Sequence, residues 1–391
     1  MALLTRRAVV MLTPRGWGTL AAVVVTYACA SGLGYAELGI VAAGGAVLLV
    51  ACVVWGVPRP RLRVDREIAP LKVARGDPAV GVVTLVNVGR RELGGLRADE
   101  VCGAGTVSVD VPSLPRGGRR TVSYAIPTRR RGEVTVGPLR LLRSDPLGLV
   151  RRVAVYGDGR TLLVRPRTFP LPMLPSGRSR HLEGPTADNA VGGTVTFHAL
   201  REYARGDDLR HVHWRSSART GRLMVRRFVD AGLPHTTIVL DVRPDVYSGG
   251  DDLAELAVDV AASVAVAAGR HGFPVRILAG SRSLVRTRGG RNDVTTLLDA
   301  LALVRPDPVE ALPEALDALR GGPAGGVLIV VTGMPEPAEF VGLAGLRGRF
   351  DRAVVVRLGA APGTALIPGA TCVDAVDAAS VIAAWQREAA R

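Results

Sequence analysis

Aromatic side chains and lysine are scarce in this sequence of 391 residues. Phe, Trp and Tyr make up only 4% of it, and Lys72 is the single lysine, so arginine carries the net charge of +15. Proteins that bind single-stranded nucleic acid stack bases on aromatic side chains placed between basic ones, and no such pattern is present. Specific nucleic-acid binding is therefore disfavoured, and we expect a core built mainly from Val, Leu and Ala.

Cysteine pairs and nucleotide-binding motifs are lacking as well. The few cysteines lie far apart without a C-x-x-C spacing, which excludes a disulfide framework or a zinc knuckle and leaves buried, reduced thiols as the expectation. Neither G-x-x-x-x-G-K-[ST] nor a G-x-G-x-x-G after a predicted strand occurs, so no cradle for ATP or a dinucleotide is predicted. We expect no cofactor. The cysteines are Cys29, Cys52, Cys102 and Cys372.

Two uncharged runs near the N-terminus, residues 17–35 and 38–57, are each long enough to cross a hydrocarbon layer of about 30 Å. Glu37 is the only charged residue between them, which predicts a tight transmembrane helical hairpin over residues 17–57. A secretory signal cleaved near Ala28–Ala30 is the alternative, disfavoured because the second span follows at once.

Arginines set the expected orientation of this hairpin. They precede the first span within residues 1–16 and follow the second span from Arg59 onward, whereas the tip has none. Basic residues stay on the cytoplasmic side, so we expect a two-pass protein of the plasma (inner) membrane. Both termini and the main domains would then be cytoplasmic, and residues 1–16 would form the cytoplasmic N-terminus.

Residues 60–166 alternate apolar and polar side chains with frequent turn signals, which predicts a β-sandwich-like domain. In one predicted strand the alternate positions from Val80 to Val88 share a face, and in another Val107, Val109 and Val111 do so. Arginines gather in the same region, and they form either a solvated strand face or a surface for anionic lipid. These arginines are Arg129, Arg130, Arg131, Arg140, Arg143, Arg151 and Arg152.

A linker rich in Pro, Gly and Ser over residues 167–190 separates this region from residues 191–391, where apolar runs alternate with helical patterns. Continuous apolar runs are typical of strands buried on both faces, so the pattern predicts an α/β domain with a mainly parallel sheet. The expected strands are 236–242, 274–280, 325–333 and 353–359, and the expected helices are 251–269, 293–304 and 377–390.

Residues 203–221, YARGDDLRHVHWRSSARTG, bring acids, arginines, histidines and hydroxyls together. Nucleophilic catalysis is disfavoured because no G-x-S-x-G turn surrounds Ser216 or Ser217. A metal site is disfavoured because His211 and His213 lack a third ligand. The acids are flanked by arginines, which keep a carboxylate ionised and unsuited to general acid catalysis.

A structural role explains more of this segment. Asp207 and Asp208 would pair with Arg210 and Arg215 in a charged clasp, and we expect Trp214 to be buried beside them. Whether the clasp is internal or meets a partner protein is left open by the sequence.

Several residues of this segment form a recognisable signature. The run resembles the signature of the bacterial domain of unknown function 58 family, and residues 131–132, 137–139 and 145–149 resemble that family's β-domain pattern. The resemblance implies a membrane anchor and a C-terminal domain similar to a von Willebrand factor A domain. It also implies genes encoded beside MoxR-type AAA+ ATPases and transglutaminase-like membrane proteins, with no enzymatic activity. The signature residues are Tyr203, Gly206, Asp207, Asp208, Arg210, Trp214, Ser217, Ala218 and Arg219.

The resemblance also concerns a metal site. Many von Willebrand A domains bind Mg²⁺ through D-x-S-x-S, and here Asp241 matches the aspartate whereas Arg243 and Asp245 replace both hydroxyl residues. Mg²⁺ needs several oxygen ligands, and Arg243 would place a cation where the metal belongs. We therefore expect no metal at this degenerate position.

Together these patterns predict a non-enzymatic, membrane-anchored scaffold or adaptor that acts with a MoxR-type AAA+ ATPase in envelope protein assembly or maturation. The alternative is an envelope-associated hydrolase that uses Asp207, His213 and Ser217, with His211 as a further candidate.

Overall fold

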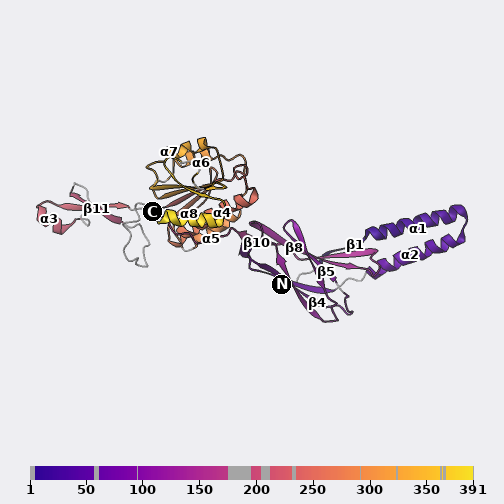
Figure 1. The fold of residues 1–391 in the computed structure, drawn as a ribbon. Coiled ribbons are helices and arrows are strands. Elements are labelled where there is room, and N and C mark those ends of the chain that lie inside the picture. The colour runs from indigo at the N-terminus through magenta and orange to yellow at the C-terminus, as the bar shows by residue number, and fades with distance from the viewer. Residues whose placement is uncertain are drawn as a thin grey trace. The chain divides into compact units, whose positions relative to one another are not determined.

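The computed structural model describes residues 5–56, 61–94, 96–174, 195–203, 212–230, 235–290, 292–322, 325–361, 363 and 367–390. The chain divides into two compact units, Met1–Arg165 and Pro166–Arg391. The first unit holds a helical hairpin and two sheets, and the second holds a short β-hairpin and an α/β sheet (Figure 1).

Helices α1 (Pro14–Leu33) and α2 (Ala36–Gly56) form the hairpin at the N-terminal end of the first unit (Figure 1). Both are long and apolar enough to cross a membrane. They begin and end within a few residues of the two predicted spans. The protein therefore has two helices that are suited to membrane association. Gly34 has a φ of 74° at the turn between them, a conformation that costs glycine little.

The base of this hairpin is bonded to the loop that follows strand β8. The Thr13 amide donates to the Leu149 carbonyl (2.9 Å), and the Thr13 hydroxyl donates to the Gly148 carbonyl (2.6 Å). The Thr13 side chain also caps α1 by accepting from the Gly16 amide (3.1 Å). A side chain at Gly16 would place its Cβ 2.1 Å from the Leu149 oxygen, so only glycine fits there.

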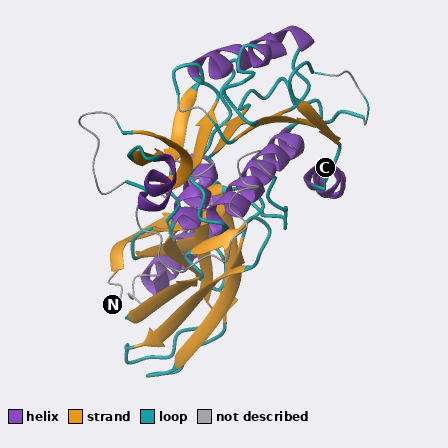
Figure 2. Ribbon diagram, turned by 90° about the vertical axis from the view of Figure 1, so that its left-hand side faces the viewer, coloured by secondary structure: helices purple, strands orange, loops and turns teal. Residues whose placement is uncertain are grey.

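The sheets of the first unit consist of strands joined by loops (Figure 2). All pairings are antiparallel except that between β10 and β3. The seven-stranded sheet contains β1 (Thr5–Leu12), β3 (Lys72–Ala74), β5 (Leu96–Cys102), β6 (Gly105–Val111), β8 (Gly132–Ser144), β9 (Val150–Tyr156) and β10 (Arg160–Arg165). The three-stranded sheet contains β2 (Leu62–Ala69), β4 (Ala79–Asn87) and β7 (Arg119–Ile126).

Strand β1 lies in the segment that the sequence predicts as a cytoplasmic N-terminus. It pairs with β9, which is more than a hundred residues away along the chain. Nothing local in TRRAVVML announces this pairing, because it depends on a distant partner strand.

Buried side chains from both sheets of the first unit form one core cluster. The alternation predicted for β4 is present, but its buried face is the one with Ala79, Val83 and Leu85, whereas Val80 is 39% exposed. Polarity alone could not choose between two faces that both carry valines. In β6 the shared face of Val107, Val109 and Val111 is confirmed.

An ion pair crosses this core from sheet to sheet. Arg66 on β2 contacts the Glu100 carboxylate on β5 at 2.5 Å, and both side chains are 2% exposed. Burial raises the pKa of Glu100, and the facing guanidinium of Arg66 partly offsets that rise. Burial also raises the pKa of the nearby Cys102 thiol to about 11. A side chain at Gly137 would collide with the Arg66 guanidinium.

The second unit begins with the pair β11 (Val195–Glu202) and β12 (Met224–Asp230), and α3 (Trp214–Thr220) lies between them in sequence. Its main sheet has the order β15-β14-β13-β16-β17-β18, and every pairing is parallel except that of β14 with β15. The strands are β13 (Thr236–Leu240), β14 (Val275–Ala279), β15 (Arg282–Arg286), β16 (Val327–Thr332), β17 (Arg352–Leu358) and β18 (Thr371–Ala375).

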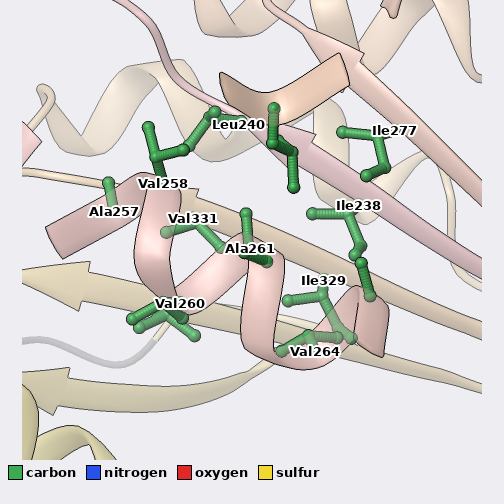
Figure 3. Packing of buried hydrophobic residues seen from close by; sticks show 14 of the residues in the cluster. Ile238, Leu240, Ala257, Val258, Val260, Ala261, Val264, Ile277, Ile329 and Val331 are labelled. Carbon is green, nitrogen blue, oxygen red and sulfur yellow. The ribbon is translucent and has the colours of Figure 1, made fainter. Parts of the chain in front are cut away.

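Helices cover both faces of this sheet, with α4, α5 and α8 on one side and α6 and α7 on the other (Figure 1). Figure 3 shows Ala257, Ala261 and Val264 of α4 against Ile238, Ile329 and other apolar side chains of the central strands. The helices are α4 (Asp251–Arg270), α5 (Asp293–Ala302), α6 (Leu312–Ala318), η3 (Pro337–Phe340), α7 (Val341–Ala344) and α8 (Ala378–Ala389).

The mainly parallel sheet and its three long helices agree with the prediction. Strands β15 and β18 and helices α6 and α7 were not predicted, because they are too short to carry a clear period. Among the cysteines, Cys52 and Cys102 are buried as expected, whereas Cys29 on α1 is exposed.

Candidate functional site

The signature segment is only partly within the described residues. Gly206, Asp207, Asp208, Arg210 and His211 lie outside them, so the predicted clasp is not tested. Tyr203 directly follows β11, the first strand of the β-hairpin, and its amide donates to the Leu223 carbonyl (2.8 Å). The remaining signature residues, Trp214, Ser217, Ala218 and Arg219, all lie on α3.

Ser217 attaches α3 to the β-hairpin. Its side chain is buried, and its hydroxyl accepts from the Met224 amide (2.8 Å) and donates to the His213 carbonyl (3.1 Å). Both hydrogen-bonding functions of the hydroxyl are therefore used by backbone groups. A serine at this signature position therefore has a structural role. Because both hydrogen bonds hold its hydroxyl against the backbone, the hydroxyl is not open to a substrate as a nucleophile must be.

His213 precedes α3 and caps it. Its Nδ1 lies 2.8 Å from the Ser216 hydroxyl and 3.3 Å from the Ser216 amide, from which it accepts. The His213 amide in turn donates to the Met224 carbonyl (2.8 Å). The contact between imidazole and hydroxyl is thus part of a helix cap, with Ser216 rather than Ser217 facing the ring.

Trp214 is 67% exposed, so the prediction that it is buried was wrong. Trp214 opens a seven-residue helix attached to a two-stranded sheet, and such a small element provides no core that could enclose an indole. Arg215, Ala218 and Arg219 on the same helix are exposed too. One aromatic and two cationic side chains therefore face outward from the signature helix.

A second candidate site lies at the carboxyl end of β13. The Asp241 carboxylate is buried and accepts from the Arg243 side chain through both oxygens, at 3.1 Å from Nε and 2.9 Å from Nη2. Thr332, at the end of the neighbouring strand β16, donates its hydroxyl to Asp241 Oδ2 (2.8 Å). Glu339 completes the cluster with Oε2 at 2.8 Å from Arg243 Nη2.

The Arg243 guanidinium is therefore held between two carboxylates. Hydrogen bonds to Asp241 raise the pKa of Arg243, with a further contribution from Glu339, so this cation is permanent. The expectation that Arg243 places a positive charge beside Asp241 is confirmed by these contacts. Among the described residues, no group of three or more His, Cys, Asp and Glu side chains could hold a metal ion.

Sequence reasoning found Asp241 and Arg243 at this strand end but missed Thr332 and Glu339. Glu339 is placed by η3, because Glu336 and Glu339 form a capping box that orients the first turn of this helix. The spacing E-P-A-E is the local signal that could have identified the cap. The meeting of Glu339 with Arg243 depends on the crossover connection and has no local signal.

These observations define a multidomain protein that combines two apolar helices with mixed sheets and flanking helices. Residues 199–344 match the model of the family described as protein of unknown function DUF58. The match covers the signature helix, the strand-end cluster and most of the α/β sheet. No curated protein matches the chain.

Solved structures give only distant likenesses. A Pseudomonas fluorescens alkylpurine DNA glycosylase bound to DNA is 13% identical, with 23% of this chain and 30% of that chain covered and a TM-score of 0.18. A β-glucosidase from Listeria innocua is 13% identical, covering 28% and 17% with a TM-score of 0.19. A putative β-galactosidase from Bacteroides fragilis is 13% identical, covering 75% and 38% with a TM-score of 0.18. None of these likenesses bears on fold or function.

Proposed function

We propose that this protein is a membrane-anchored adaptor whose signature helix α3 binds a protein partner. The observation that carries the proposal is the exposure of the signature residues Trp214, Ala218 and Arg219. Exposed Trp and Arg side chains are the residue types most enriched among those that dominate protein interfaces. With Ser217 turned inward, α3 presents its other signature side chains outward.

The chemistry of this surface favours an acidic partner. Arg215 and Arg219 lie one turn apart, and a helix presents such i, i+4 neighbours on one side. Among the described residues Arg222 is already paired with Glu202 (2.8 Å), and we propose Arg215 and Arg219 as the cations that contact the partner. In agreement with the family resemblance, the proposed partner is a MoxR-type AAA+ ATPase, and the proposed process is envelope protein assembly or maturation.

In this role the first unit would anchor the protein in the membrane, and the second unit would carry the partner-binding helix α3. We infer that the facing sheets of the first unit form a β-sandwich, since their buried side chains share one core. We infer also that the second unit is von Willebrand A-like, with Asp241 at the aspartate position of its lost metal motif. In that domain the Arg243 guanidinium replaces the metal ion and closes the strand end.

The adaptor proposal is tested by binding of the purified ATPase to the full-length protein in detergent, with and without ATP. Trp214→Ala should weaken binding by about 2 kcal/mol or more, the scale of a dominant interface residue, and Arg219→Ala should weaken it less. Val309→Ala and Arg270→Ala are matched controls on other exposed surfaces and should bind like the unchanged protein.

Two results contradict the proposal. The first is an ATPase that does not bind the full-length protein in either nucleotide state. The second is an affinity that Trp214→Ala leaves unchanged, which would place the contact elsewhere.

A further inference from the structure

A groove of about 620 Å³ lies on the seven-stranded sheet of the first unit, and its volume is typical of small-ligand sites. Its walls come from β5, β6, β8 and β9 and combine both signs of charge with apolar side chains. The lining residues are Leu96, Arg97, Asp99, Asp110, Val111, Leu142, Ser144 and Arg151.

The charges in the groove are not all neutralised by one another. Arg97 lies 3.4 Å from Asp99, whose carboxylate also accepts from Ser108 (2.8 Å). Within the described part of the chain, Asp110 and Arg151 form no ion pair, and both are exposed to the groove's solvent. Arg97 lies opposite Asp110 in the β5–β6 register and beside Asp99, and it can neutralise only one of these two acids. One net negative charge and the cation of Arg151 are therefore available to a ligand that carries both charges.

Arg151 and Asp110 lie at opposite sides of the groove. Arg151 is on β9 and Asp110 is on β6, with β8 and β5 between them. Three strand spacings of about 4.8 Å and an offset of two residues along the strands place their backbones roughly 16 Å apart. The side chains of Arg151 and Asp110, together with a phosphate joined to an ammonium group, are long enough to span this distance.

The groove lies beside the base of the helical hairpin. Ser144 and Arg151 flank the loop whose Leu149 carbonyl accepts from Thr13, the residue before α1. The twenty residues of α1 rise about 30 Å, the thickness of a bilayer's hydrocarbon core, so Thr13 belongs at its boundary. The side of the groove near Arg151 is thus at the level of the lipid headgroups.

Exposed apolar side chains surround that same end. Met11 is 57% exposed and lies opposite Arg151 in the β1–β9 register, so both project from the groove face. Leu147, in the loop bonded to Thr13, is 51% exposed. A molecule with its headgroup in the groove would therefore meet apolar side chains on the bilayer side.

We propose that this groove binds the headgroup of a zwitterionic phospholipid with a primary ammonium group, of the phosphatidylethanolamine type. Arg151 contacts the phosphate, Asp110 accepts from the ammonium group, and the acyl chains leave past Met11 and Leu147 into the bilayer. The inference rests on membrane insertion of α1 and α2 and is independent of the partner proposed for α3.

The test uses the full-length protein in nonionic detergent, titrated calorimetrically with three short ligands. These are dihexanoyl phosphatidylethanolamine, dihexanoyl phosphatidylglycerol, which lacks the amine, and glycerophosphoethanolamine, which lacks acyl chains. We expect the first to bind at least tenfold more tightly than either of the others. Asp110→Asn should remove the preference over phosphatidylglycerol, and Arg151→Gln should weaken both lipids about tenfold.

Glu133→Gln and Arg120→Gln change exposed charges outside the groove and should leave all affinities unchanged. Equal affinities for the two lipids in the unchanged protein would show an unspecific charged surface and overturn the proposal. Equal affinities for phosphatidylethanolamine and glycerophosphoethanolamine would show a soluble ligand and overturn it too.

Discussion

At the scale of single residues, Arg243 is the side chain that most changes the chemistry of its site. It donates to both oxygens of the buried Asp241 and contacts Glu339, so two carboxylates converge on one guanidinium. The Thr332 hydroxyl adds a third oxygen within the same cluster. Without the guanidinium, these groups would be oxygen ligands for a hard divalent cation.

Arg243→Ala should therefore lower the free energy of unfolding by about 3–5 kcal/mol, since it leaves buried charge unpaired. Mg²⁺ or Ca²⁺ at millimolar concentration should then raise the melting temperature of Arg243→Ala but not that of the unchanged protein. Thermal unfolding in detergent, with and without the cation, measures both effects.

Arg357→Ala is the matched control for this experiment. Arg357 pairs bidentately with the single carboxylate of Asp374, at 2.7 and 2.8 Å, and both side chains are buried. Its loss should destabilise the fold without creating a cation site. If Mg²⁺ raised the melting temperature of both variants, or of neither, Asp241 and Glu339 would not be a cation site that the Arg243 guanidinium occupies.

At the scale of elements, the junction between α1 and the loop after β8 connects the helical hairpin to the sheets of the first unit. Leu149 and Val150 pack with Leu49 and Cys52 of α2 in a small cluster. The Thr13 hydrogen bonds add to this contact. Gly16 is required because the Leu149 carbonyl occupies the space of its side chain.

Gly16→Ala should consequently destabilise this unit by about 1–3 kcal/mol, the usual cost of overpacking. Gly18→Ala, two residues further along α1, has open space around the added Cβ and should be neutral or stabilising by up to about 1 kcal/mol. Comparing the two melting temperatures in the same detergent separates steric overlap from helix propensity. Equal shifts for both variants would show that the junction does not limit stability.

At the scale of the whole molecule, the two apolar helices and the arginines around them predict the orientation in the membrane. Glu37 lies at the hairpin tip, in the first turn of α2, and Arg387 is exposed near the end of α8. The positive-inside bias puts the tip outside the cytoplasm and α8 inside it.

In a variant whose four cysteines are replaced by alanine, Glu37→Cys should react with a membrane-impermeant maleimide in intact cells. Arg387→Cys should react only after the cells are permeabilised. The reverse pattern would invert the topology, and with it the cytoplasmic location of the proposed partner.

The sequence alone determined the features that depend on local pattern. The two spans are predicted within a few residues because a bilayer demands a long uncharged run. The parallel strands β13, β14, β16 and β17 are predicted because burial on both faces leaves continuous apolar runs. The cation beside Asp241 is predicted because Arg243 is two residues away.

Only the tertiary structure decided what depends on residues far apart in the chain. The pairing of β1 with β9, the buried face of β4 and the contact of Thr332 with Asp241, 91 positions earlier, have no local signal. The same holds for Trp214, whose polarity predicts burial but whose short helix provides no core to enclose it. Burial and long-range contacts are properties of the packed chain, so an apolar side chain becomes a surface feature wherever packing leaves it uncovered.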